Sequence, residues 1–157
     1  MKRGLLLAAL QAGIVLLTGA KYLTDRSSLP RVWARAQPFD PNLPIRGRYV
    51  RLAIEVKLEG EPSDLGAVKL FAKNSELHAM RTTEDTGNHL WWGPNARPNR
   101  SLSEAVAYFI PEHIPDPSRL RPGEELWVEV SIPRKGPPRP IRLAVKKDTT
   151  FTVLPLD

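Results

Sequence analysis

The chain of 157 residues is 41% apolar and 25% charged, which allows one folded domain with a short appendage and argues against wholesale disorder. Sixteen prolines argue against a helical bundle, and the absence of cysteine excludes disulfides, thiolate metal sites and cysteine nucleophiles. The net charge of +6 does not indicate a nucleic-acid partner, because residues 1–36 hold six basic residues against one acidic residue and leave the rest at +1.

The first predicted element is a hydrophobic helix over residues 4–20, which follows Lys2 and Arg3 and contains Gln11 as its one strongly polar side chain. At about 1.5 Å per residue it spans roughly 25 Å, near the short limit for a bilayer core. An uncleaved anchor is the favoured interpretation, and a signal peptide cleaved after residues 18–20 is the alternative. We therefore expect residues 1–21 to be a signal-anchor or transmembrane helix.

A juxtamembrane connector is expected over residues 22–37, because Leu29-Pro30 interrupts a helix and Trp33 suits the membrane interface. The basic residues around the helix make membrane lipid an expected partner. The expected location is the inner (cytoplasmic) membrane, crossed once, with residues 38–157 forming a β-rich domain in the periplasm or outside. The sheet itself is expected to begin near residue 46.

Alternation of apolar and polar residues with a period of two predicts the strands of this domain, most strongly over residues 49–58. Further strands are expected at residues 67–72, 76–80, 105–110, 126–132, 141–145 and 149–154, with a helical turn at 116–120. Short strands with proline-rich joints predict an all-β antiparallel sandwich or small barrel. The expected core comprises Val50, Leu52, Ile54, Val56, Phe109, Val128 and Val130.

Three segments resemble the GDYXXLXY family, bacterial membrane-anchored proteins of unknown function. Residues 47–54 resemble its signature strand, residues 38–47 its P-x-D-P lead-in, and residues 108–112 its Y-F-V-P-E segment. Arg48 replaces the acidic residue of the signature, and Ile54 replaces its final tyrosine. The resemblance implies no assigned reaction, and it implies a multi-pass membrane protein as partner. The matched motif and structural polar positions are Asp40, Arg46, Gly47, Tyr49, Leu52, Tyr108 and Glu112.

Two carboxylates and a guanidinium within these motifs form the first candidate constellation. Asp40, Arg46 and Glu112 are interpreted as an arrangement that fixes how the proline-rich lead-in meets the sheet, with a polar binding site as the alternative. Tyr49 and Tyr108 are expected to pack, or to form hydrogen bonds across the core.

The three histidines, at positions 78, 89 and 113, lack the spacing of a metal site and are expected to be solvated. No cofactor and no metal ion is predicted.

Adjacent tryptophans form the most unusual loop of the sequence. Trp91 and Trp92 are candidates for contact with a partner, and the alternative is that one ring plugs the open end of the sandwich. Successive side chains of an extended segment point to opposite sides, so we expect Trp92 to be buried with Leu90 and Trp91 to be exposed.

The sequence therefore predicts a membrane-anchored extracytoplasmic accessory or interaction module rather than an enzyme. The alternative is a hydrolase-like enzyme, because residues 40–50 faintly resemble the strand entry of membrane-tethered signal-peptidase-like barrels. Those proteases place their serine where this chain has Pro38, and Ser27 and Ser28 lie far upstream. No catalytic residue is predicted.

Overall fold

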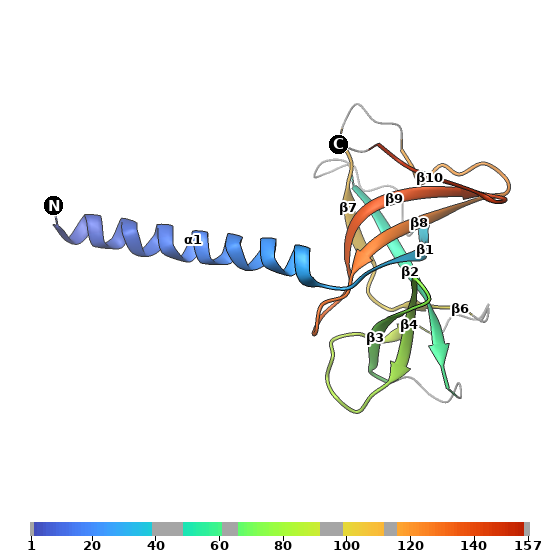
Figure 1. Cartoon of the computed structure of the whole chain (residues 1–157), viewed down its shortest axis with the longest axis horizontal. Coiled ribbons are helices and arrows are strands. Elements are labelled where there is room, and N and C mark those ends of the chain that lie inside the picture. Colours follow the sequence, from blue (N-terminus) through green and yellow to red (C-terminus); the bar gives the residue numbers. More distant parts are fainter. Residues whose placement is uncertain (1, 39–48, 61–65, 92–98, 112–115, 156–157) are drawn as a thin grey trace.

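A single long helix and a curled sheet make up the computed structural model, which describes residues 2–38, 49–60, 66–91, 99–111 and 116–155 (Figure 1). The expectation of a β-rich domain behind one N-terminal apolar helix is confirmed. The helix is α1 (Lys2–Ser28). The strands are β1 (Arg31–Pro38), β2 (Tyr49–Glu59), β3 (Val68–Lys73), β4 (Glu76–Arg81), β5 (Leu90–Trp91), β6 (Asn99–Leu102), β7 (Val106–Phe109), β8 (Glu124–Ser131), β9 (Arg139–Lys147) and β10 (Thr150–Val153).

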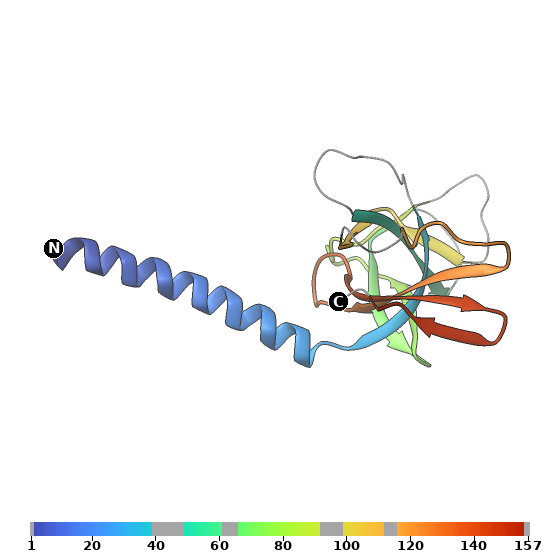
Figure 2. The same cartoon turned by 90° about the horizontal axis from the view of Figure 1, so that it is seen from above.

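Helix α1 projects away from the sheet instead of packing on it (Figures 1 and 2). Its apolar stretch, Leu6–Thr24, is long enough to cross a membrane and has none of its residues buried inside the protein. Leu6 and Leu17, for example, are 72% and 74% exposed. The described part of the chain thus buries none of this apolar stretch.

The expected connector over residues 22–37 is wrong. Residues 22–28 continue α1, and β1 begins after only Leu29 and Pro30. Proline ends the helix because it lacks an N–H group and excludes the helical conformation at the preceding residue. The Pro30 carbonyl accepts a hydrogen bond from the Ile132 amide at 3.0 Å, so the chain enters the sheet at once.

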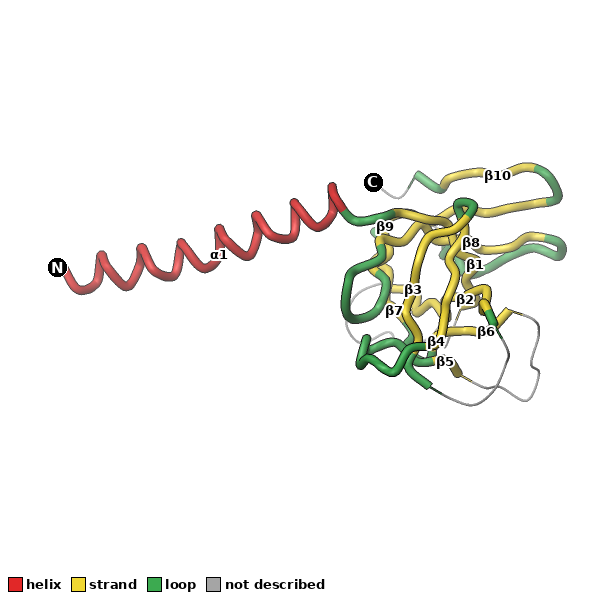
Figure 3. Tube along the Cα trace, turned by 60° about the horizontal axis from the view of Figure 1, so that its bottom comes forward, coloured by secondary structure: helices red, strands yellow, loops and turns green. Residues whose placement is uncertain are grey.

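The strands form one mixed sheet that curls into a half-barrel (Figure 3). Its principal order is β10-β9-β8-β1-β4-β2-β6-β5, while β3 pairs with β4 and β7 pairs with β2. The expectation of a purely antiparallel sheet is wrong, because β4 runs parallel to both β1 and β2. Strands β3 and β4 form a hairpin whose turn residues Asn74 and Ser75 have φ angles of 51° and 63°. Only the returning strand of this hairpin reaches β2, and it runs in the same direction as β2.

The core lies on the inner face of the curl, where every second residue of β1, β2, β8 and β9 is apolar. Residues with at most 1% exposure there include Leu52, Ile54, Val56, Val128, Val130 and Leu143. The expected core positions on β2 and β8 are therefore confirmed. Phe109 was expected in the core but is 72% exposed, because Val106 and Ile110 are the buried residues of its segment. The Phe109 ring packs instead against Tyr49, with 6.1 Å between ring centroids.

The opposite burial of two expected core residues gives a matched test of the fold. Leu52→Ala is expected to lower the free energy of unfolding by about 2–5 kcal/mol, since it leaves a cavity at a fully buried site. Phe109→Ala removes a larger but exposed side chain, so we expect a change of about 1 kcal/mol or less. Denaturant titration of both variants checks the difference, and equal costs would contradict the assigned register of β2 and β7.

Candidate functional site

The sheet branches where β1, β2 and β4 meet, and a pocket occupies the branch. Strand β1 pairs with β4 at Trp33 and with β2 from Ala36 onward, whereas β2 pairs with β4 from Lys57 onward. Backbone pairing between the strands is therefore interrupted where these three ladders meet. A pocket of about 240 Å³ lies at this interruption, on the face of the sheet opposite the core.

A buried carboxylate organises the pocket. Glu55 is only 6% exposed, and its Oε1 accepts a hydrogen bond from Gln37 Nε2 at 2.5 Å. Arg35 lies beside it, with Nε 4.0 Å from Glu55 Oε2, and places Nη2 3.2 Å from Glu125 Oε1. Trp127 Nε1 donates a hydrogen bond to the other oxygen of Glu125 at 3.3 Å. Because a buried carboxylate needs donors and a nearby cation, Glu55 fixes the guanidinium, which in turn orders the rim of the pocket.

The charges that line the pocket balance one another. Three cationic side chains and three carboxylates line it: Arg35, Lys57 and Lys146 against Glu55, Glu76 and Glu125. Lys57 forms an ion pair with Glu76 across β2 and β4. Such a lining suits an uncharged polar group or a zwitterion better than a group of one charge sign, because the lining charges already neutralise one another.

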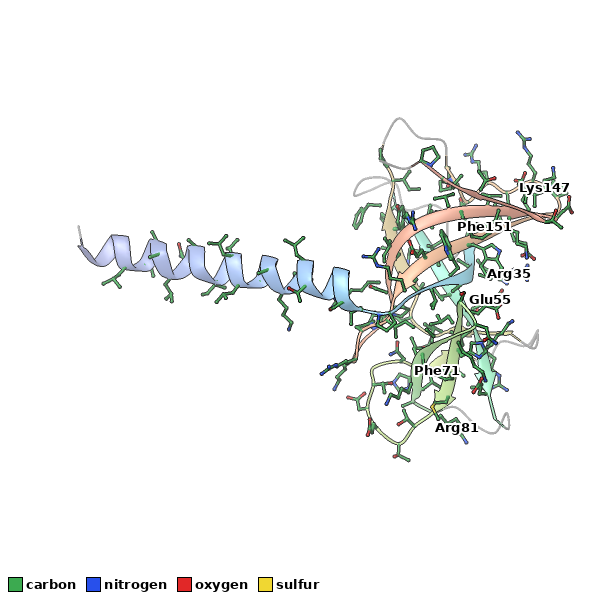
Figure 4. All side chains as sticks on the ribbon, in the orientation of Figure 1. Arg35, Glu55, Phe71, Arg81, Lys147 and Phe151 are labelled. Carbon is green, nitrogen blue, oxygen red and sulfur yellow. The ribbon has the colours of Figure 1, made fainter. Side chains whose placement is uncertain are left out.

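An aromatic cluster borders the pocket on the same face of the sheet. The Phe151 ring meets Trp33 edge-on at 4.9 Å between centroids and Trp127 at 6.1 Å. Arg142 stacks over Trp33 at 5.9 Å, and Lys146 over Trp127 at 5.4 Å. We call these five residues the aromatic face. Figure 4 shows the labelled Phe151, Arg35 and Glu55 on the side of the domain away from α1.

A second polar cluster lies on β2, β3 and β4. Glu59 forms an ion pair with Lys73, whose ammonium group donates a hydrogen bond to the carboxylate. This hydrogen bond lowers the pKa of the Glu59 carboxyl group below its usual 4.5. His78 was expected to be solvated but is 9% exposed, because it lies between β2 and β3 and its ring contacts Phe71. Its Nδ1 is 3.3 Å from Glu59 Oε1, an ion-pair distance without hydrogen-bond geometry. The cluster joins two basic side chains to one carboxylate, an arrangement suited to ion pairing.

The structure brings together three of the positions singled out from the sequence. Strands β2 and β7 pair antiparallel, so that Tyr49 lies opposite Phe109, and Leu52 lies opposite Val106. The Tyr108 hydroxyl donates a hydrogen bond to the Ile141 carbonyl of β9 at 3.4 Å and so links the two ends of the curl. Tyr108 therefore forms a hydrogen bond, the alternative to packing alone, and its ring also packs against the core.

The remaining sequence candidates cannot be placed. Asp40, Arg46, Gly47, Trp92, Glu112 and His113 lie outside the described residues. Trp91 is described only as part of β5, where its backbone pairs with Ser101. The structure therefore leaves the ion-pair arrangement of the lead-in and the opposite burial of the two tryptophans as predictions.

The aromatic face was missed by sequence reasoning, although a signal was present. Trp33, Trp127 and Phe151 each occupy the phase of their strand that points away from the core. A large aromatic residue at a solvent-facing strand position is a signal for a binding surface. Trp33 was assigned to the membrane interface instead, because the strand that contains it was taken for a connector.

Comparison with family models finds no match, and neither curated proteins nor solved structures match the chain significantly. The resemblance to the GDYXXLXY family therefore stays a prediction. In the described part of the chain, no group of three or more histidine, aspartate and glutamate side chains is arranged to hold a metal ion.

Proposed function

We propose that this protein is a membrane-anchored interaction module of the inner membrane. In this proposal α1 lies in the bilayer and the β domain stands on its outer surface. The aromatic face and its pocket then contact an extracytoplasmic segment of a multi-pass membrane protein. The observation that carries the proposal is the long apolar helix, which the described part of the chain leaves unburied.

The exposed surface of α1 supports the membrane part of the proposal. Nine large apolar side chains between Leu6 and Leu23 are 58–74% exposed. Since burying one such side chain is worth about 1.5–3 kcal/mol, leaving all of them in water would forfeit an amount comparable to the whole stability of a domain. At about 1.5 Å per residue, the nineteen residues of the span match a hydrocarbon core of about 30 Å.

Continuity of α1 favours a retained anchor over a cleaved signal peptide. The helix passes Ala20 without a break, and the hydroxyls of Thr18 and Thr24 each donate to the carbonyl four residues earlier. Beyond that point Tyr22 lies under Arg139 of β9, with 5.5 Å from the guanidinium carbon to the ring centroid. Cleavage after Ala20 would cut inside this continuous helix, about two turns before its end at Ser28.

Two properties of the aromatic face support a partner-binding role. Tryptophan and arginine are enriched among the residues that dominate binding energy at protein interfaces. Phe151 and Val153 are 42% and 41% exposed, and they lie on β10, which pairs only with β9 among the described strands. The other side of β10 thus offers backbone N–H and C=O groups to an added strand.

Carbonate extraction tests the anchor. The full chain is expected to stay in the membrane fraction through alkaline washing, because α1 is held by the hydrocarbon core, while its domain is cleaved by protease added from the outer side. A mature chain that begins at Lys21, detected by mass spectrometry, would show that the helix is a signal peptide.

Crosslinking in native membranes tests the aromatic face. Phe151→Ala is expected to reduce recovery of the crosslinked multi-pass protein by roughly five- to thirty-fold, the loss typical of an interface residue worth 1–2 kcal/mol. Phe109→Ala is the matched control, since it removes an exposed phenylalanine on β7 and should leave recovery unchanged. Equal recovery with both variants would contradict the assignment of the contact surface.

A further inference from the structure

A second cleft lies where α1 meets the domain, away from the aromatic face. Its volume is about 870 Å³. Lys21 and Ser28 of α1 line it together with the loop between β8 and β9, and Leu70 of β3 and Ile132 are among its apolar lining residues. Figure 1 shows this loop, residues 133–138, beside the end of α1.

The lining of this cleft has one sign of charge. Five basic side chains line it, and no acidic side chain of the described residues does: Lys21, Lys69, Arg134, Lys135 and Arg139. Asp85 approaches from a neighbouring loop and pairs with Lys135 at 3.1 Å, with both side chains well exposed. Such an exposed pair is worth little, so an anion of higher charge density can take its place. The cleft is therefore suited to an anionic ligand.

Buried hydrogen bonds hold the basic loop in place. The Gly136 amide donates to the Thr86 carbonyl at 2.8 Å, and Asn88 Nδ2 donates to the Gly136 carbonyl at 2.9 Å. Both partners are 7% exposed, and Thr86 Oγ1 is itself fixed on the Val68 carbonyl at 2.6 Å. Gly136 has a φ of 91°, which favours glycine. The two cationic residues that precede it are thus positioned before any ligand binds.

The height of the cleft along α1 identifies the anion, provided that α1 lies in a membrane as proposed above. Lys21 and Ser28 are seven residues apart, which corresponds to a rise of about 10 Å along the helix. A headgroup layer is about 5–8 Å thick on each side of the hydrocarbon core. Because the apolar span ends within this stretch, the cleft opens at the level of the headgroups.

We propose that this junction cleft binds the headgroup of an anionic phospholipid. The phosphodiester lies between Arg134 and Lys135 on the loop and Lys69 on β3, and Lys21 approaches it from α1. The apolar lining residues Leu70 and Ile132 contact the glyceryl part of the lipid. Bound lipid joins α1 to the β8–β9 loop and so fixes the orientation of the domain on the membrane.

Thermal unfolding of the full chain in dodecyl maltoside micelles tests this inference, with tryptophan fluorescence as the readout. Dioleoyl phosphatidylglycerol is expected to raise Tm by about 3–6 °C, because a ligand that binds only the folded protein stabilises it. Dioleoyl phosphatidylcholine, inorganic phosphate and hexaglutamate are expected to leave Tm unchanged. A shift with phosphate or hexaglutamate would overturn the lipid assignment, and no shift with phosphatidylglycerol would overturn the site.

Two double variants distinguish lipid binding in the cleft from general electrostatic attraction to the protein. Arg134→Gln with Lys135→Gln should remove at least half of the shift, whereas Arg121→Gln with Lys147→Gln removes the same charge at the far end of the domain and should retain it (Figure 4). Equal losses would overturn the proposal. If the loop variant does not fold, Lys69→Gln on β3 provides the same comparison. If the protein stays in the membrane through carbonate washing but phosphatidylglycerol does not change its Tm, the anchor proposal stands and the lipid-site proposal is contradicted.

Discussion

The structure depends on one constraint: only two residues separate the end of α1 from an interior strand of the sheet. Strand β1 pairs with β8 along most of its length and then with β2, so its direction is fixed by ladders on both sides. The hydrogen bond to the Pro30 carbonyl secures the residue directly before β1. If α1 lies in a membrane as proposed, this junction holds the domain directly against the headgroups, because two residues leave no slack for a flexible tether.

The two proposed binding surfaces lie at opposite sides of this arrangement. Close to α1, the loop held by Thr86 and Asn88 presents basic side chains where headgroups are expected. On the side away from α1, the branch of β1, β2 and β4 interrupts the ladders and leaves a pocket that Glu55 organises. The aromatic face beside this pocket is assembled from β1, β8, β9 and β10, strands that are distant in the sequence. Its location suits contact with a protein segment that extends beyond the membrane surface.

The alternation of apolar and polar residues predicted the core positions of β2 and β8. In a strand buried on one face every second side chain points to the core, and Leu52 and Val128 follow that pattern. It failed at Phe109, because three consecutive large side chains from Tyr108 onward do not alternate with polar ones. The pattern there does not show which side chains face the core. It also missed β1, whose buried residues are small and whose first residues follow a helix-ending proline. The parallel pairing of β4, and the meeting of Trp33 with Phe151, depend on tertiary topology and have no local signal in the sequence.

The most direct test of this account is the depth of α1 in a bilayer. The chain contains no cysteine, so single cysteines at Leu10, Leu17, Ser28 and Lys147 can carry spin labels in the full protein reconstituted into phospholipid vesicles. If α1 lies in the bilayer, oxygen, which concentrates in the hydrocarbon, should relax the labels at positions 10 and 17. A water-soluble nickel chelate should relax the label at 147, and position 28 should be intermediate. Equal access of the chelate to all four positions would contradict a membrane-embedded α1.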